Sequence, residues 1–226
     1  MLLATPADYC LYGASFQVRR ERLPLAGPTF TTVDRIDEIV KKWSGDPQVR
    51  ELAEKITSWT EQHNTRQQAK AIFDWVRSHT RYVRDPVSTE LLRTPDVIIQ
   101  GIVRDGFAAL DCDDYVVFLG ALLASLGIPV RAKKIGFSPV AGTYQHIYIE
   151  VKAANGFDQR DDWVPLDPTF PATQAGLTWR NGQREIAIPL GEAKEQFSCC
   201  GISLGGLIKW AGVFALAYIG IKGLGG

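Results

Sequence analysis

Residues 110–127 read LDCDDYVVFLGALLASLG, and this stretch decides the fold. A cysteine among three aspartates is followed by apolar residues at almost every position, which predicts a helix from Cys112 to Leu126. Such a helix has no polar face, so we expect it to be buried on all sides at the centre of a domain. Gly127 suits the position that follows a helix, and Pro129 lies just beyond.

Helical spacing of apolar residues precedes this central helix, and alternating patterns follow it. We expect an arm of strands or extended chain over residues 1–33. The helices predicted before Cys112 cover about 34–43, 47–59, 65–78 and 94–103. The strands predicted after it cover 130–137, 145–153 and 162–170, with a shorter one at 185–190. Helices followed by an antiparallel meander define an α+β domain, with the cysteine helix packed on the sheet.

Three residue types in this order indicate the chemistry of a thiol nucleophile. Cys112 opens the helix, His146 begins a predicted strand and Asp167 lies on the next one. A thiolate attacks carbonyl carbon, an imidazole accepts the thiol proton, and a carboxylate orients the imidazole. The helix N-terminus favours a thiolate. The neighbouring aspartates oppose it and should raise the pKa of Cys112.

Composition excludes several other classes of function. The 226 residues carry 25 basic and 25 acidic side chains, so we expect no nucleic-acid partner. Four cysteines at irregular positions predict no disulfide framework, and the three histidines lack zinc-ligand spacing with them. We therefore expect neither a metal nor a cofactor. The opening residues 1–8, MLLATPAD, lack a basic and an apolar leader region, so no secretory signal peptide is expected.

Residues 69–170 resemble the transglutaminase-like superfamily, part of the papain-like group of cysteine enzymes. The matching motifs are FDWV at 73–76, RYVRDP at 81–86, LRTP at 92–95, DCDD at 111–114, LGIPVR at 126–131, HIYIEV at 146–151 and WVPLDP at 163–168. The resemblance implies a papain-like core of the compact bacterial or phage type. It also implies Cys112 as nucleophile, His146 as general base and acid, and Asp167 as the residue that orients His146.

The chain divides into four predicted regions. These are an N-terminal arm with helices (1–64), a transglutaminase-like catalytic core (65–170), a connector (171–200) and an apolar, glycine-rich C-terminal helix (201–226). The last region has no acidic residue, and about 20 residues suffice to cross a bilayer. Three interpretations of it stay open: a membrane anchor, a helix buried in a protein assembly, and a helix packed on this domain.

The sequence thus predicts a thiol-dependent acyl-transfer enzyme, either an amide or peptide hydrolase or a transglutaminase-type enzyme. Its expected partner is a peptide or protein amide, with a membrane or assembly contact through residues 201–226. Asp113 and Asp114 are interpreted as helix caps and surface contacts. The alternative is a non-catalytic structural protein, associated with a membrane or a virion, that keeps the fold and is held by its C-terminal helix.

Overall fold

The computed structural model describes residues 28–86, 91–137, 144–153, 163–169 and 184–191. The chain divides into two units, residues 1–192 and 193–226, and all the described residues belong to the first. The predicted arm up to residue 27 and the predicted apolar helix at 201–226 lie outside the described residues. Among the described helices, none is long and apolar enough to cross a membrane.

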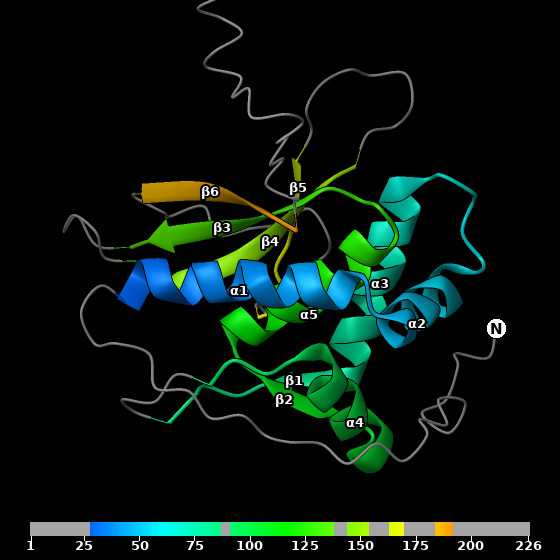
Figure 1. Cartoon of the computed structure of the whole chain (residues 1–226), viewed down its shortest axis with the longest axis horizontal. Coiled ribbons are helices and arrows are strands. Elements are labelled where there is room, and N and C mark those ends of the chain that lie inside the picture. The colour runs from blue at the N-terminus through cyan, green and yellow to red at the C-terminus, as the bar shows by residue number, and fades with distance from the viewer. Residues whose placement is uncertain (1–27, 87–90, 138–143, 154–162, 170–183, 192–226) are drawn as a thin grey trace, which may run out of the picture. The chain divides into compact units, whose positions relative to one another are not determined.

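Five helices and six strands make up the described part of the chain (Figure 1). The helices are α1 (Pro28–Ser44), α2 (Pro47–Thr57), α3 (Thr65–His79), α4 (Pro95–Asp105) and α5 (Cys112–Ser125). The strands are β1 (Thr80–Tyr82), β2 (Ala108–Leu110), β3 (Val130–Gly136), β4 (His146–Lys152), β5 (Trp163–Leu166) and β6 (Arg184–Leu190). This is the α+β architecture that the sequence predicts.

The main sheet has the strand order β5-β4-β3-β6, and every neighbouring pair is antiparallel. Strands β3 to β5 form the predicted meander, whereas β6 returns to lie on the other side of β3. Both edge strands carry a proline, Pro165 on β5 and Pro189 on β6. Proline has no N–H to offer to a further strand, so these residues limit pairing at the edges of the described sheet.

Helix α5 is the buried centre of the domain, as predicted. Its side chains from Asp113 to Leu123 are all buried, and Leu119, Leu122 and Leu123 are completely so. Full burial of such a side chain stabilises the fold by about 1.5–3 kcal/mol. At Gly120 the helix lies between α1 and β4, where an added Cβ would sit 3.0 Å from Val40 and 3.3 Å from Ile149.

Both ends of α5 are fixed by specific contacts. The Asp111 carboxylate accepts the backbone N–H of Asp114 at 3.3 Å and so caps the first turn. At the other end Gly127 takes a positive φ of 76°, and the N–H of Ile128 reaches back to the carbonyl of Leu123 at 3.2 Å. Glycine adopts this left-handed conformation without strain, which agrees with the predicted helix end.

Helix α1 joins the two ends of the described domain. It packs on α5 through one apolar face, and its Asp37 accepts the backbone N–H of Gly191, just beyond β6, at 2.9 Å. Asp37 also pairs with Lys41 at 3.0 Å. The first helix and the last described strand are therefore bound to each other across 154 positions of sequence.

One local prediction was wrong, and one strand pair was missed. Helix α1 begins at Pro28, inside the predicted arm, because proline is well suited to the first turn of a helix. A parallel pair of three-residue strands, β1 and β2, was not expected. The segment around β1 was predicted only as an extended exit, and β2 reads Ala-Ala-Leu, which is too short for a period-two pattern. The predicted region boundaries near 64, 170 and 200 stay predictions.

The crowding at Gly120 can be tested against a second helical glycine, Gly101 on α4. A Cβ at Gly101 would meet only ordinary contacts, the closest being Ala108 at 3.5 Å. We expect Gly101→Ala to raise the free energy of unfolding by up to about 1 kcal/mol through helix propensity. Gly120→Ala should lower it by about 1–2 kcal/mol, because overpacking outweighs propensity. Urea unfolding measures both, and equal effects would contradict the close approach of α1, α5 and β4.

Candidate active site

The position of Cys112 follows from the short parallel strand pair. Strand β2 ends at Leu110, opposite Tyr82 of β1, and the chain enters α5 two residues later. The Tyr115 hydroxyl lies 2.9 Å from the Thr80 hydroxyl, which itself donates to the carbonyl of Val76. The first turn of α5 is thereby tied to the end of α3. The cysteine is the first residue of the helix, as the sequence predicts.

His146 and Asp167 lie side by side on neighbouring strands. His146 is the first residue of β4, and Asp167 directly follows β5, which pairs with β4. The two side chains are 10% and 0% exposed, and His146 Nε2 lies 2.7 Å from Asp167 Oδ2. Thr169 donates its backbone N–H (3.1 Å) and its hydroxyl (2.7 Å) to the other oxygen of Asp167. The carboxylate is held on both oxygens.

These contacts determine which nitrogen of His146 carries a proton. Burial alone would raise the pKa of Asp167. The hydrogen bond to His146, the charge of His146 and the two donors of Thr169 together lower it by more than burial raises it, so the pKa lies below its ordinary value. An ionised carboxylate only accepts hydrogen bonds, so His146 Nε2 carries the shared hydrogen. The nitrogen that can exchange a proton with another group is therefore Nδ1.

The thiol of Cys112 lies at the start of the same strand. Its side chain is half-buried, and the backbone N–H of Ile147, the residue after His146, is near enough to lower the pKa of the thiol. The sulfur also donates to Asp113 Oδ1 at 3.1 Å. The fold thus brings the three residues predicted from the sequence to one region, from the N-terminus of α5, the start of β4 and the end of β5.

The surroundings of Cys112 oppose ionisation of the thiol. Burial is the largest cause and raises its pKa strongly, followed by the charge of Asp113, the hydrogen bond to Asp113 and the charge of Asp111. Only the Ile147 N–H acts in the other direction among the main causes. The predicted effect of the aspartates is confirmed in direction, whereas the larger effect of burial was not foreseen.

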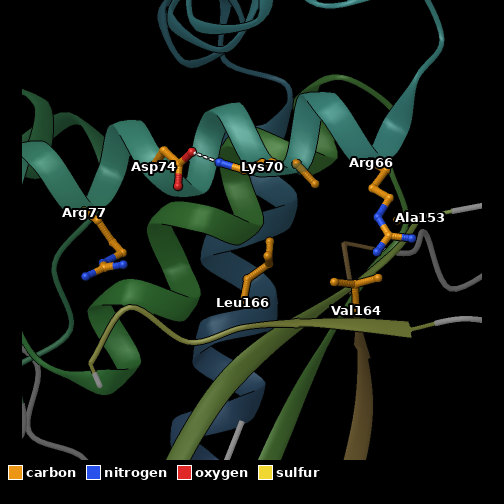
Figure 2. Close-up of a pocket in the computed structure, with 8 residues that line it drawn as sticks. Arg66, Lys70, Asp74, Arg77, Ala153, Val164 and Leu166 are labelled. Carbon is orange, nitrogen blue, oxygen red and sulfur yellow. Dashed lines mark hydrogen bonds and ion pairs between the residues drawn. The ribbon is translucent and has the colours of Figure 1, made fainter. Parts of the chain in front are cut away.

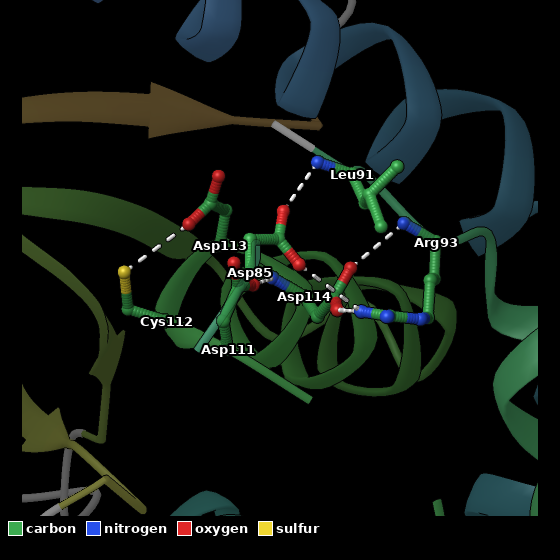
Figure 3. A network of polar contacts seen from close by, with 7 residues as sticks. All are labelled: Asp85, Leu91, Arg93, Asp111, Cys112, Asp113 and Asp114. Carbon is green, nitrogen blue, oxygen red and sulfur yellow. Dashed lines mark hydrogen bonds and ion pairs between the residues drawn. The ribbon is translucent and has the colours of Figure 1, made fainter. Parts of the chain in front are cut away.

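Asp113 and Asp114 are not surface contacts, contrary to the prediction from the sequence. They are 6% and 0% exposed. The Asp114 carboxylate accepts the backbone N–H of Arg93 at 2.7 Å and forms an ion pair with its guanidinium. Asp85 accepts the N–H of Leu91 and lies 3.9 Å from the same guanidinium (Figure 3). Asp114 therefore anchors the chain between β1 and α4 to the first turn of α5.

For two residues of this site the sequence alone suggested no role. Arg93 was noticed only within a family motif, because its partner Asp114 lies 21 positions later. Thr169 could have been found from the spacing Asp-x-Thr, since an aspartate commonly accepts hydrogen bonds from the backbone two residues on. The burial of an aspartate cannot be predicted from its sequence neighbours when its hydrogen-bond partner lies far away along the chain.

A groove of about 490 Å³ lies between α3 and β5 (Figure 2). Along α3 it is bordered by Arg66, Lys70, Asp74 and Arg77, and Lys70 pairs with Asp74. Val164 and Leu166 form its apolar side on β5. None of the three predicted site residues lines it, although Leu166 directly precedes Asp167.

A domain with a thiol at the start of a buried helix and a hydrogen-bonded His–Asp pair on the adjoining sheet has the layout of a thiol-dependent enzyme. The sequence pattern of the transglutaminase-like superfamily matches residues 50–168, just over half of the 226 positions. The chain belongs to the transglutaminase-like superfamily. At the level of the superfamily, this supports a thiol-dependent enzyme of the cysteine peptidase or transglutaminase type.

No curated protein matches the chain. Among solved structures, it is similar to a proposed cysteine protease from Cytophaga hutchinsonii, with 18% sequence identity and a TM-score of 0.39. The match covers 63% of this chain and 45% of that one, so the chain spans less than half the length of that protein.

The anchor formed by Asp114 can be tested by removing its partner. Arg93→Ala leaves a fully buried carboxylate without its guanidinium, so we expect the free energy of unfolding to fall by about 3 kcal/mol. Arg104→Ala is the matched control, because Arg104 pairs with Asp105 while 78% exposed; it should leave stability nearly unchanged. Chemical unfolding distinguishes the two, and similar small losses would contradict a buried anchor.

The ionised state of Asp167 predicts a pH dependence of stability. Its folded-state pKa lies below the ordinary 3.8, so the unfolded chain binds more protons. The stabilisation is therefore present above about pH 4 and is lost as the pH falls through the folded pKa. We expect Asp167→Asn to be less stable than the wild type at pH 6, with the difference shrinking below pH 4.

Urea unfolding at a series of pH values tests this expectation. The exposed Asp74→Asn on α3 is the control and should stay within about 0.5 kcal/mol of the wild type. If the free energies of unfolding of the wild type and Asp167→Asn instead moved further apart toward low pH, Asp167 would not be an ionised, hydrogen-bonded group in the folded state.

Proposed function

We propose that the protein is a thiol-dependent acyl-transfer enzyme that acts on peptide or protein amides. Cys112 is its nucleophile, His146 its general base and acid, and Asp167 the residue that orients His146. The observation that carries the proposal is the 2.7 Å contact between His146 Nε2 and a fully buried Asp167, beside the strand start that contacts the Cys112 sulfur.

The reaction follows from these positions. The Cys112 sulfur bonds to the amide carbon while its proton passes to His146 Nδ1, and Asp167 stabilises the resulting imidazolium. The backbone N–H of Cys112, at the start of α5, is a donor for the oxyanion. His146 then gives the proton to the leaving amine as the C–N bond breaks, which leaves a thioester on Cys112.

The second half of the reaction releases the acyl group. A water molecule, or the amine of another molecule, loses a proton to His146 and attacks the thioester carbon. The C–S bond then breaks, the acyl product leaves, and His146 returns the proton to the sulfur. Attack by water makes the protein an amide or peptide hydrolase, and attack by an amine makes it a transglutaminase-type enzyme. Compact members of this superfamily favour hydrolysis as the first activity to test.

A second candidate is a non-catalytic protein that keeps the fold. One observation favours it: burial and two aspartates raise the pKa of the Cys112 thiol and so disfavour a thiolate. In this proposal residues 201–226 hold the protein at a membrane or in an assembly such as a virion. Deleting them would then abolish assembly, and Cys112→Ala would have no effect.

Turnover and adduct formation test the first candidate. With a library of peptide amides, we expect mass spectrometry to detect an acyl adduct on Cys112, and Cys112→Ala to lose turnover completely. His146→Ala should lower kcat by about 10²–10⁴-fold, the usual contribution of a general base. The control His63→Asn changes an exposed histidine with φ of 62° and should leave kcat unchanged.

The opposite result would be equally clear. Turnover that survives Cys112→Ala, or loses as much from His63→Asn as from His146→Ala, would exclude this catalytic assignment. Absence of any Cys112 adduct across the library, together with failed assembly on deleting 201–226, would favour the second candidate.

A further inference from the structure

The Cys112 thiol has a hydrogen-bond acceptor that the proposed reaction does not use. Its sulfur donates to Asp113 Oδ1 at 3.1 Å, and Asp113 is only 6% exposed. Figure 3 shows these two side chains on one side of the start of α5, with Asp114 directed instead toward Arg93. A carboxylate held this close to sulfur accepts a thiol hydrogen and repels a thiolate.

The other groups around the sulfur do not cancel this effect. Asp111, on the same turn, adds a second negative charge. From β1, the Tyr82 phenol interacts with the charges of Cys112 and Asp111, and burial is the main reason its own pKa is raised. From β4, the Ile147 N–H favours the thiolate, and His146 lies next to it with Asp167 behind.

We propose that Asp113 is a positioning residue that keeps Cys112 as a hydrogen-bonded thiol at rest, so that the nucleophile forms only when the proton passes to His146 during attack. This inference rests on the proposed function of Cys112. The thiol hydrogen turns from Asp113 Oδ1 to His146 Nδ1, the S–H bond breaks as the S–C bond forms, and Asp113 stays ionised throughout. No thiolate–imidazolium pair accumulates before substrate arrives.

This arrangement has a chemical consequence for the resting protein. Alkylating agents and oxidants react with the thiolate, so a thiol held by Asp113 should be slow to react in the absence of substrate. A thiolate is also a stronger nucleophile when the thiol it comes from has a higher pKa. A sulfur that loses its proton only during attack therefore keeps this higher nucleophilicity. In this proposal Asp113 makes Cys112 unreactive toward other reagents until an amide substrate is bound.

The rate of Cys112 alkylation by iodoacetamide, measured against pH on the full chain, tests the inference. Peptide mass spectrometry separates Cys112 from the other three cysteines. In Asp113→Asn we expect the midpoint of the pH profile to fall by about one unit or more. Asp111→Asn is the matched control: it also removes one charge and keeps a capping side chain, but leaves the Asp113 contact, so its midpoint should fall less.

Two further variants make the result decisive. Asp113→Ser also removes the carboxylate and should show the same downward shift, which provides an answer if Asp113→Asn does not fold; far-ultraviolet circular dichroism identifies folded variants. The shift should persist when His146→Ala is added, because Asp113 acts on the thiol directly. A midpoint that does not move in either Asp113 variant, or moves only as far as in Asp111→Asn, would overturn the inference.

Alkylation requires no substrate, so this result is separate from the proposed function. A downward shift in a protein that turns over no amide would overturn the enzyme and leave the Asp113–thiol contact as observed. Turnover that depends on Cys112 and His146, with an unmoved midpoint in both Asp113 variants, would overturn the inference and leave the enzyme.

Discussion

Burial of α5 on every side is the constraint on which the rest of the structure depends. Its side chains contact α1, α2, α3 and the main sheet, so its lateral surface is occupied by the core. Chemistry can therefore take place only at an end of the helix. The N-terminal end carries a positive partial charge, which suits a reaction that develops negative charge on oxygen.

The same constraint explains the concentration of carboxylates beside the thiol. Asp111 caps α5, Asp114 anchors Arg93 and Asp113 accepts the thiol hydrogen, so three acidic residues have three different partners. Each contact fixes the first turn. The charges of Asp113 and Asp111 also make the environment of Cys112 more negative, whereas Asp114 is paired with the Arg93 guanidinium. The helix N-terminus favours the thiolate form of Cys112, and the carboxylates favour the neutral thiol. Burial shifts this equilibrium further toward the neutral thiol.

Much of this organisation could be predicted from residue patterns. The apolar run after Cys112, the prolines and glycines at helix ends, and the alternation around His146 each depend on neighbours in sequence. His146 and Asp167 were expected from the order of cysteine, histidine and aspartate along the chain and from the family motifs around them. What could not be predicted depends on distant partners: the burial of Asp114 against Arg93, the pairing of β1 with β2, and the return of β6 to β3.

The contact between Asp37 on α1 and Gly191 after β6 has a consequence for how the chain is made. Helix α1 leaves the ribosome long before α5 and β6, so its apolar residues Ile36 and Val40 are without their final neighbours during most of synthesis. The fold closes only once the last strand has docked, which makes folding depend on contacts of high sequence separation. Newly made chains therefore pass through a stage in which the helix that begins with Cys112 is present but the elements that cover it are incomplete.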